Sequence, residues 1–197
     1  AKFLLRDSGG ALVGENNGVF TTNDNGGFTI IGLTPGVTIT ATQTDTISGY
    51  VLDETPQSIL IKSGNAQSLA FYNAPKGALV VRKLDAATEE PLAGAEFRIV
   101  PADESLFTDN EGLTSPNNLY VTDADGQISL SGLTPGAYVI TETNAPEGYS
   151  LDSEAQTVTV RSGRTESVSF YDSELAILKI LKRDAVSKQP LADAEFT

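Results

Sequence analysis

Three charged residues end rows of apolar side chains in the middle of this sequence. Lys83 ends such a row in the run ALVVRKLD, Glu142 in AYVITE, and Asp172 in SVSFYD. Side chains two positions apart share one face of a strand. The alternation therefore places one amine and two carboxyl groups on faces that otherwise bury apolar side chains.

These three groups are sufficient for amide-bond formation if the strands bring them together. Burial disfavours the charged form of each, so a neutral amine would lie beside a protonated carboxyl group, a nucleophile beside an electrophile. Glu142 would hydrogen-bond the Asp172 carboxyl group, polarise it and carry the proton as water leaves. The product is an amide between Lys83 and Asp172. In the alternative interpretation, each side chain simply reaches solvent at the end of its strand.

The composition argues against several other kinds of chemistry. Cysteine, histidine, methionine and tryptophan are absent, which excludes thiol- and histidine-based catalytic dyads, ordinary zinc sites and disulfides. The run DADG resembles part of a calcium loop, but the EF-hand order would put Val121 and Gly132 at ligand positions. We predict a hairpin turn there instead, and we expect no cofactor and no bound metal.

The chain of 197 residues is acidic, since 13 basic and 26 acidic residues give a formal net charge of −13. Without a cluster of Lys and Arg, such a chain is a poor partner for nucleic acid or an anionic membrane. Apolar residues make up 40% of the chain and form no long uncharged run, so we expect no membrane insertion. The sequence starts at Ala1 without a signal peptide or sorting tail, and we expect a piece of a longer protein.

The sequence repeats with a period of about 100 residues, which is the length of a domain. LAFYN recurs as VSFYD, and KLDAATEEPLAGAEF recurs as KRDAVSKQPLADAEF. We predict three units: repeat 1 at 1–74, lacking its first strand; the complete repeat 2 at 75–173; and the first strand of a third repeat at 174–197.

Each repeat has the pattern of an all-β domain. Its apolar runs are short, alternate with polar residues and are rich in Val, Ile, Thr and Tyr, while Gly, Pro, Asn and Asp separate them at turn spacing. No segment shows a sustained helical period. We therefore predict an all-β fold of tandem immunoglobulin-like or prealbumin-like β-sandwich domains, arranged end to end.

Three motifs in order, PLAGA, GLTPGAY and ETNAPEGY, carry a family resemblance. Across essentially its whole length, the chain resembles the Cna B-type (SpaA-like, prealbumin-like) repeats of Gram-positive surface adhesins and pilins. The resemblance implies a bond from a Lys on the first strand to an Asn or Asp on the last, assisted by a Glu. Those roles fall on Lys83, Asp172 and Glu142. Because the acceptor is Asp instead of the commoner Asn, the leaving group is water instead of ammonia.

Repeat 1 departs from this pattern. Asn73 stands at the acceptor position, but Thr42 or Ala41 replaces the glutamate, depending on where a one-residue insertion falls. The strand that carries the lysine would lie before Ala1. We therefore predict no crosslink in repeat 1.

The segment 174–197 corresponds to the opening of repeat 2. Lys182 matches Lys83, but its glutamate and acceptor would follow Thr197. Repeat 2 already has its own first strand, whereas repeat 1 lacks one. We hypothesise that residues 176–184 complete a repeat 1 sheet in a neighbouring chain by strand addition.

The main function hypothesis is a structural stalk or spacer of a surface protein, stiffened by the crosslink and packed against neighbouring repeats. The resemblance implies an extracellular, cell-wall-anchored location. The alternative is a module that binds a host protein or glycan, with Phe107 and Tyr120 in the insertion at 101–120 as candidate contacts. The sequence does not name a host ligand. We do not expect an enzyme, because the reaction consumes its own residues.

Overall fold

The computed structural model describes residues 1–14, 16–64, 66–103, 115, 117–193 and 195. Within these residues the chain forms strands β1 to β11 and one short 3-10 turn, η1. The runs ALVVRKL, QISLSGL, AYVITE, QTVTV and SVSFYD each lie in a strand. The prediction of an all-β fold is confirmed.

Repeat 2 consists of two sheets that face each other. The first has the strand order β11-β5-β8, and the second has the order β10-β9-β6-β7. Strand β5 is central in its sheet, parallel to β11 and antiparallel to β8. The strands are β5 (Gly77–Asp85), β6 (Glu96–Pro101), β7 (Leu119–Val121), β8 (Gln127–Leu133), β9 (Gly136–Asn144), β10 (Gln156–Val160) and β11 (Thr165–Asp172).

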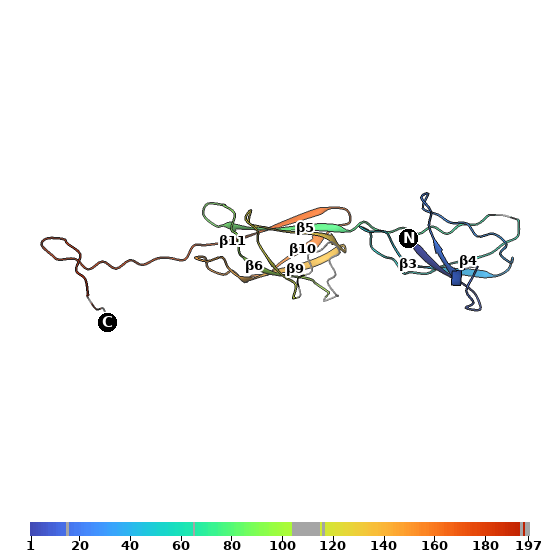
Figure 1. Ribbon diagram of the computed structural model, residues 1–197, viewed down its shortest axis with the longest axis horizontal. Helices are drawn as coiled ribbons and strands as arrows, with labels where there is room; N and C mark the ends of the chain where they lie inside the picture. The colour runs from blue at the N-terminus through green and yellow to red at the C-terminus, as the bar shows by residue number, and fades with distance from the viewer. Residues whose placement is uncertain (15, 65, 104–114, 116, 194, 196–197) are drawn as a thin grey trace.

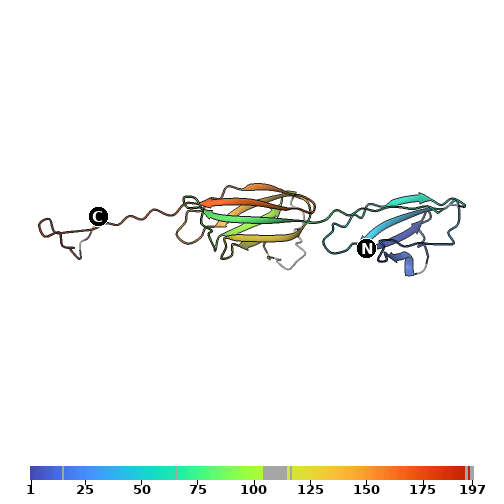
Figure 2. The same ribbon diagram turned by 90° about the horizontal axis from the view of Figure 1, so that it is seen from above.

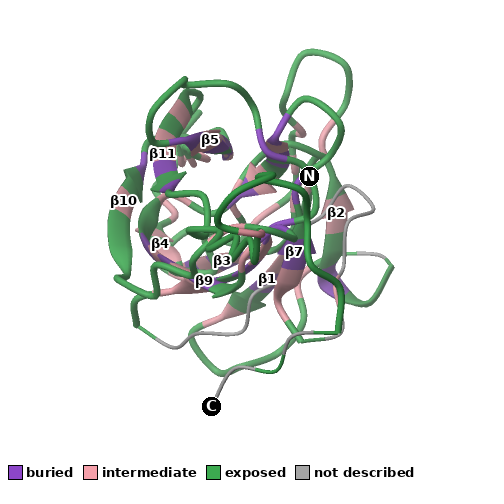
Figure 3. Ribbon diagram, turned by 90° about the vertical axis from the view of Figure 1, so that its left-hand side faces the viewer, coloured by how far each residue is buried: buried purple, intermediate pink, exposed green. Residues whose placement is uncertain are grey.

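The inward faces of these two sheets form the core of repeat 2. Alternate residues of β5 are buried, and Leu79 and Val81 pack against Phe97, Ile140 and Phe170 from other strands. Figure 3 shows such buried positions in purple along the strands. The apolar rows of the sequence thus do form the interior, as period-2 alternation requires.

Repeat 1 has a single described sheet with the strand order β2-β1-β3-β4. It corresponds to the β7-β6-β9-β10 sheet of repeat 2. Its elements are β1 (Lys2–Asp7), η1 (Asn16–Gly18), β2 (Val19–Thr21), β3 (Thr38–Asp45) and β4 (Gln57–Leu60).

Among the described residues of repeat 1 there is no second sheet. The segments 27–33 and 69–73, which match β8 and β11 in sequence, lie in no strand. In repeat 2 both of those strands hydrogen-bond to β5, which lies between them. None of the strands described in repeat 1 corresponds to β5. The two flanking segments therefore lack the backbone partner that would make them strands.

The two repeats follow one another along the long axis of the molecule, and the C-terminal segment continues in the same direction (Figures 1 and 2). Backbone bonds fix the junction: the Val51 N–H donates to the Ala74 oxygen at 2.9 Å, and the Lys76 N–H donates to the Gly49 oxygen at 2.8 Å. The Ser162 hydroxyl of repeat 2 donates to the Pro75 oxygen. No helix in the described part of the chain has the length and apolarity needed to cross a bilayer.

Candidate functional site

Lys83 lies in the centre of repeat 2, on the middle strand of its sheet. Its side chain is 0% exposed and follows Leu79 and Val81 on the inward face of β5. The backbone at this position is fixed as well, because the Lys83 N–H donates to the Gly126 oxygen at 2.8 Å. Gly126 has a φ of +67°, and a Cβ there would lie 2.7 Å from the Lys83 oxygen. The turn that contains DADG therefore holds Lys83 in place, and its last residue must be small.

Asp172 comes to Lys83 from the neighbouring parallel strand. It is the last residue of β11, where Phe170 pairs with Lys83 and Asp172 pairs with Asp85. The Asp172 carboxyl group forms an ion pair with the Lys83 amine, and both side chains are fully buried. The first and last strands of the repeat thus meet at this pair.

Glu142 reaches the same point from the facing sheet. It follows Tyr138 and Ile140 on the inward row of β9, and its side chain is also fully buried. The Lys83 Nζ donates to Glu142 Oε2 at 2.8 Å. The structure therefore brings together the three residues that the sequence pattern selects, two from one sheet and one from the other.

Two aromatic rings enclose this cluster. The Phe97 ring centroid lies 6.0 Å from the Lys83 Nζ, and Phe97 pairs with Glu142 in the sheet. The Phe170 ring packs against Phe97 with centroids 4.8 Å apart and an interplanar angle of 58°. The register places both rings beside the cluster, because Phe170 pairs with Lys83 and Phe97 pairs with Glu142, and there they help to exclude water from the amine and the two carboxyl groups.

Burial raises the pKa of Glu142 to about 7. The hydrogen bond and charge of Lys83 oppose this rise, whereas the nearby Asp172 carboxyl group adds to it. Around neutral pH, Glu142 therefore exists in both protonation states and is able to accept a proton as well as to release one. Within the described part of the chain, Glu142 Oε1 and Asp172 Oδ2 are buried without a hydrogen-bond partner.

This arrangement is suited to one covalent step. In such a step the Lys83 Nζ, as a neutral amine, would attack Cγ of the protonated Asp172 carboxyl group, so that an N–C bond forms and a C–O bond breaks. Glu142 would accept a proton from nitrogen and return one to the departing hydroxyl, so that one water leaves. A neutral amide would then stand in place of the buried ion pair, without the desolvation cost that keeps charged groups out of protein interiors.

The counterpart of Glu142 in repeat 1 is Gln43, so the prediction of Thr42 or Ala41 at this position is wrong. The inward row of β3 is Ile39, Ala41 and Gln43, which matches Tyr138, Ile140 and Glu142 of β9. Phe3 pairs with Gln43 as Phe97 pairs with Glu142. The extra residue of repeat 1 therefore lies before Ile39. Following the apolar row instead of counting from GLTPG would have found Gln43.

Gln43 and Asn73 form a neutral pair at the position of the charged cluster. Each side-chain amide donates to the oxygen of the other at 3.0 Å, and Asn73 Nδ2 also donates to the Val51 oxygen at 2.8 Å. Gln43 is fully buried. These two amides satisfy each other without an amine, and they contain no group that could carry a proton as a carboxyl group does.

The remaining candidates lie apart from the cluster. Lys182 is exposed on the C-terminal segment. Tyr120 is a buried residue of β7 and belongs to the core of repeat 2, so it is not an exposed ligand contact as predicted. Phe107 lies outside the described residues. In the described part of the chain, no three His, Cys, Asp or Glu side chains form a group that could hold a metal ion.

A sequence model of the SpaA domain, described as a prealbumin-like fold domain, matches residues 1–75 and 77–174. The chain belongs to this family. The two matches cover both repeats and end close to the point where the C-terminal segment leaves repeat 2.

One curated relative is the collagen adhesin of Staphylococcus aureus, which is 32% identical over 81 residues. The match covers 41% of this chain and 6% of that adhesin, so the chain spans only a small part of its length.

Two solved structures have similar folds. The minor pilin GBS52 of Streptococcus agalactiae is 20% identical with a TM-score of 0.47, over 92% of this chain and 86% of the pilin. A mutant of the shaft pilin SpaA of Lactobacillus rhamnosus GG is 19% identical with a TM-score of 0.45, over 90% of this chain and 94% of the pilin.

Proposed function

We propose that this chain is a stalk segment of a Gram-positive surface adhesin or pilin, located outside the cell and anchored to the cell wall. In this proposal repeat 2 is stiffened by an amide bond that forms autocatalytically between Lys83 and Asp172, with Glu142 as the proton carrier. The observation that carries the proposal is the fully buried cluster of Lys83, Glu142 and Asp172. Membership of the SpaA family and the similarity to a collagen adhesin support it.

The position of the bond suits a segment that carries tension. Parallel strands β5 and β11 run side by side, so the chain enters repeat 2 at one end of this pair and leaves at the other. With the bond in place, tension passes from Lys83 directly to Asp172. The strands between them lie in a closed loop that the force bypasses.

The bond also stabilises folded repeat 2 when no tension acts on the chain. Lys83 and Asp172 are about 90 residues apart in the sequence, and by analogy with a disulfide, closing a loop of that size stabilises the folded state by about 4–5 kcal/mol. The chain has no cysteine, so a disulfide is not an alternative crosslink in these small domains. The bond would form once per molecule, which is maturation and not enzymatic turnover.

The intact mass of the denatured chain tests the proposal. We expect the wild-type mass to be one water below the sequence value, and a proteolytic fragment should contain Lys83 joined to Asp172. Glu142→Gln should restore the full mass. Glu147→Gln is the matched control, because Glu147 is an exposed residue of the following loop, and it should still lose one water. A wild-type mass equal to the sequence value would contradict the proposal.

A further inference from the structure

Asp85 is the next inward residue of β5 after Lys83, and it is buried. A third carboxyl group therefore lies on the strand row that carries the amine. Within the described residues, however, the ion pairs of Lys83 are with Glu142 and Asp172. The burial of Asp85 thus has a reason other than the charge of Lys83.

The Asp85 side chain binds the backbone of the turn that follows β5. Asp85 Oδ1 accepts hydrogen bonds from the Ala87 N–H and the Thr88 N–H, both at 2.7 Å. The Thr88 and Ala87 N–H groups hold the pKa of Asp85 below its ordinary value. Asp85 is therefore ionised at neutral pH, and an ionised carboxylate is a poor acceptor for an amine.

Backbone hydrogen bonds close the same turn, which spans residues 85–90. The Asp85 N–H donates to the Glu90 oxygen and the Glu89 N–H donates to the Asp85 oxygen, both at 2.9 Å. Glu89 has a φ of +61°, a conformation that residues other than glycine rarely adopt. The bonds of Asp85 hold the turn in this conformation, so Asp85 fixes the path of the chain as it leaves β5.

The 85–90 turn has a counterpart at residues 184–189, built on Asp184. Asp184 Oδ1 accepts from the Val186 N–H at 3.0 Å and from the Ser187 N–H at 2.7 Å. The Asp184 N–H donates to the Gln189 oxygen at 2.9 Å, as the Asp85 N–H does to the Glu90 oxygen. An aspartate that binds the N–H groups two and three residues later is a local device, so the sequence itself encodes the turn.

The 85–90 turn directs one free N–H group at the acceptor strand. The Ala86 N–H donates to the backbone oxygen of Asp172 at 2.8 Å. Asp172 is the last residue of β11, and its Cα partner on β5 is Asp85. This bond therefore holds the end of β11 at the residue whose carboxyl group forms an ion pair with Lys83.

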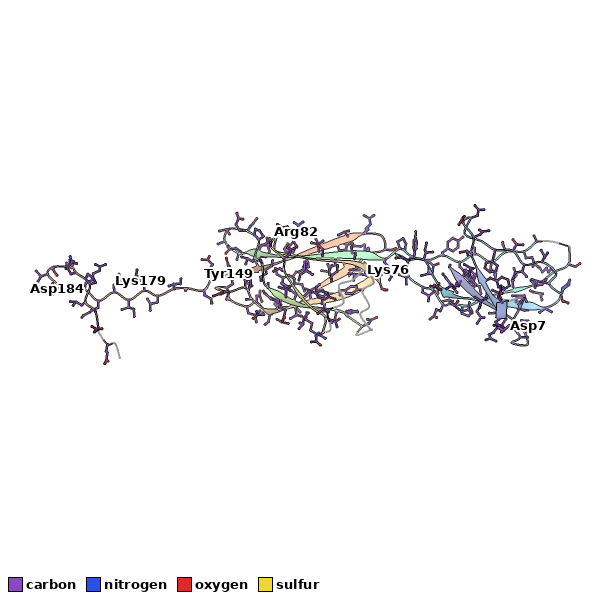
Figure 4. All side chains as sticks on the ribbon, viewed as in Figure 1. Asp7, Lys76, Arg82, Tyr149, Lys179 and Asp184 are labelled. Atoms are coloured by element: carbon purple, nitrogen blue, oxygen red, sulfur yellow. The ribbon has the colours of Figure 1, made fainter. Side chains whose placement is uncertain are left out.

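The loop that follows β9 meets the same turn. The Tyr149 hydroxyl donates to the Asp85 carboxyl group. The Ser150 N–H donates to the Ser173 oxygen at 3.0 Å, directly after Asp172. Figure 4 labels Tyr149 at this end of repeat 2. The strands that carry the amine and the two carboxyl groups of the cluster therefore all end beside Asp85.

We propose that Asp85 is a positioning residue for amide-bond formation between Lys83 and Asp172. Its carboxylate fixes the turn, the turn places the Ala86 N–H, and that N–H holds Asp172 against the amine. Asp85 itself exchanges no proton and forms no bond in the reaction. This inference rests on the proposed function, because it concerns the same reaction. A displacement of about 1 Å between reacting groups costs up to about 100-fold in rate, so the placement of Asp172 should set the rate of the reaction.

The rate of bond formation in newly made chains tests this inference. Cell-free synthesis of the full chain with a short pulse of labelled amino acids gives molecules of one age. Their intact mass after denaturation gives the fraction that has lost one water at each time. Protease resistance of the chains that retain the water gives the folded fraction, which separates a slow reaction in folded molecules from slow folding.

Substitutions of the turn aspartate should change this rate in a defined order. Asp85→Ala removes the acceptor of two backbone N–H groups and should slow bond formation by about 10- to 100-fold. Asp85→Asn keeps a side-chain oxygen for the same two N–H groups and should restore most of the rate. Asp184→Ala is the matched control, because it makes the same change in the matching turn, far from the cluster (Figure 4), and should leave the rate unchanged.

Ala86→Pro tests the link between the turn and Asp172 separately. Proline removes the N–H that binds the Asp172 oxygen but leaves Asp85 and its two hydrogen bonds in place. Proline also suits the second position of such a turn. Ala86→Pro should slow bond formation about as much as Asp85→Ala. The double variant should be no slower than either, because both changes act through the same hydrogen bond.

Three results would overturn the inference while the wild-type chain still loses one water, so the proposed function would stand. They are a wild-type rate in Asp85→Ala, a wild-type rate in Ala86→Pro, or an Asp85→Asn chain as slow as Asp85→Ala. The last result would assign the effect to the charge of Asp85 instead of to the turn. If Asp85→Ala stays protease-sensitive, Ala86→Pro alone decides. A wild-type chain that never loses water would remove the reaction itself and, with it, the role of Asp85.

Discussion

Repeats 1 and 2 place polar pairs at the same point of the same fold, but the two pairs have different chemistry. In repeat 2, Glu142 and Asp172 require the Lys83 amine, because two buried carboxyl groups cannot satisfy each other when both are ionised. In repeat 1, Gln43 and Asn73 donate to and accept from each other, and their remaining amide hydrogens go to the backbone oxygens of Asp45 and Val51, so no charged partner is needed. Carboxyl groups beside an amine thus form a charged buried cluster in repeat 2, whereas two amides at the same strand positions form a neutral pair in repeat 1.

The largest effect should come from Lys83→Met, which leaves both carboxyl groups without the amine. We expect the loss of the crosslink, about 4–5 kcal/mol, and a further cost of about 3–5 kcal/mol for the uncompensated buried groups. Urea unfolding followed by circular dichroism measures the sum. If the free energy of unfolding fell by less than about 2 kcal/mol, the cluster would contribute little to the stability of repeat 2.

The same variant should show a defined pH dependence. Removing Lys83 removes the influences that lower the pKa of Glu142, so burial and Asp172 raise it further above about 7, against a reference value of 4.5. A raised pKa in the folded state favours the protonated form, so stability is greatest below pH 4.5 and falls as pH rises through the folded pKa. Lys83→Met should therefore be less stable at pH 8 than at pH 5. Adding Glu142→Gln to this variant should remove most of the difference in stability between pH 5 and pH 8. If Lys83→Met were more stable at pH 8 than at pH 5, the raised pKa assigned to Glu142 would be wrong.

The next largest effect is expected in the length to which repeat 2 extends when a single molecule is stretched. When single molecules are stretched from their ends, wild-type repeat 2 should contribute almost no extension, because its strands lie inside the crosslinked loop. Glu142→Gln should release about 300 Å of additional chain, which corresponds to about 90 residues. Repeat 1 should extend in both proteins and so serves as an internal control. Full extension of wild-type repeat 2 would show that the bond is absent.

A smaller effect is expected when repeat 1 is given the acceptor of repeat 2. Asn73→Asp replaces an amide that donates to Gln43 and Val51 by a carboxyl group, which when ionised donates to neither. We expect repeat 1 to lose about 1–3 kcal/mol, measured as a shift of its own unfolding transition. The intact mass should still show the loss of only one water, from repeat 2. A second water loss would mean that the acceptor alone makes repeat 1 reactive.

The smallest effect is expected for the reverse exchange, Asp172→Asn. The leaving group becomes ammonia, but the amide that forms is the same. The mature variant should therefore have the same intact mass and the same unfolding transition as the mature wild-type chain. A mass one ammonia higher would show that an asparagine acceptor does not react in this site.

The alternation of the sequence predicts β5, β9 and β11 of repeat 2 and the charged residue on the inward row of each strand. Strict alternation fixes which side chains share a face, and a charged residue at the end of an apolar row is conspicuous because its burial is costly. Lys83, Glu142 and Asp172 all stand out in the sequence for this reason.

Features that depend on partners distant in sequence follow from the fold and not from the local pattern. Gln43, and not the predicted Thr42 or Ala41, is the counterpart of Glu142 because the pairing of β3 with β1, and not the distance from GLTPG, sets which residues face inward. Residues 27–33 and 69–73 have the composition of strands but lie in none, because a strand exists only when another strand hydrogen-bonds to it. The local pattern shows which face of a segment is buried, whereas the fold decides which partner buries it.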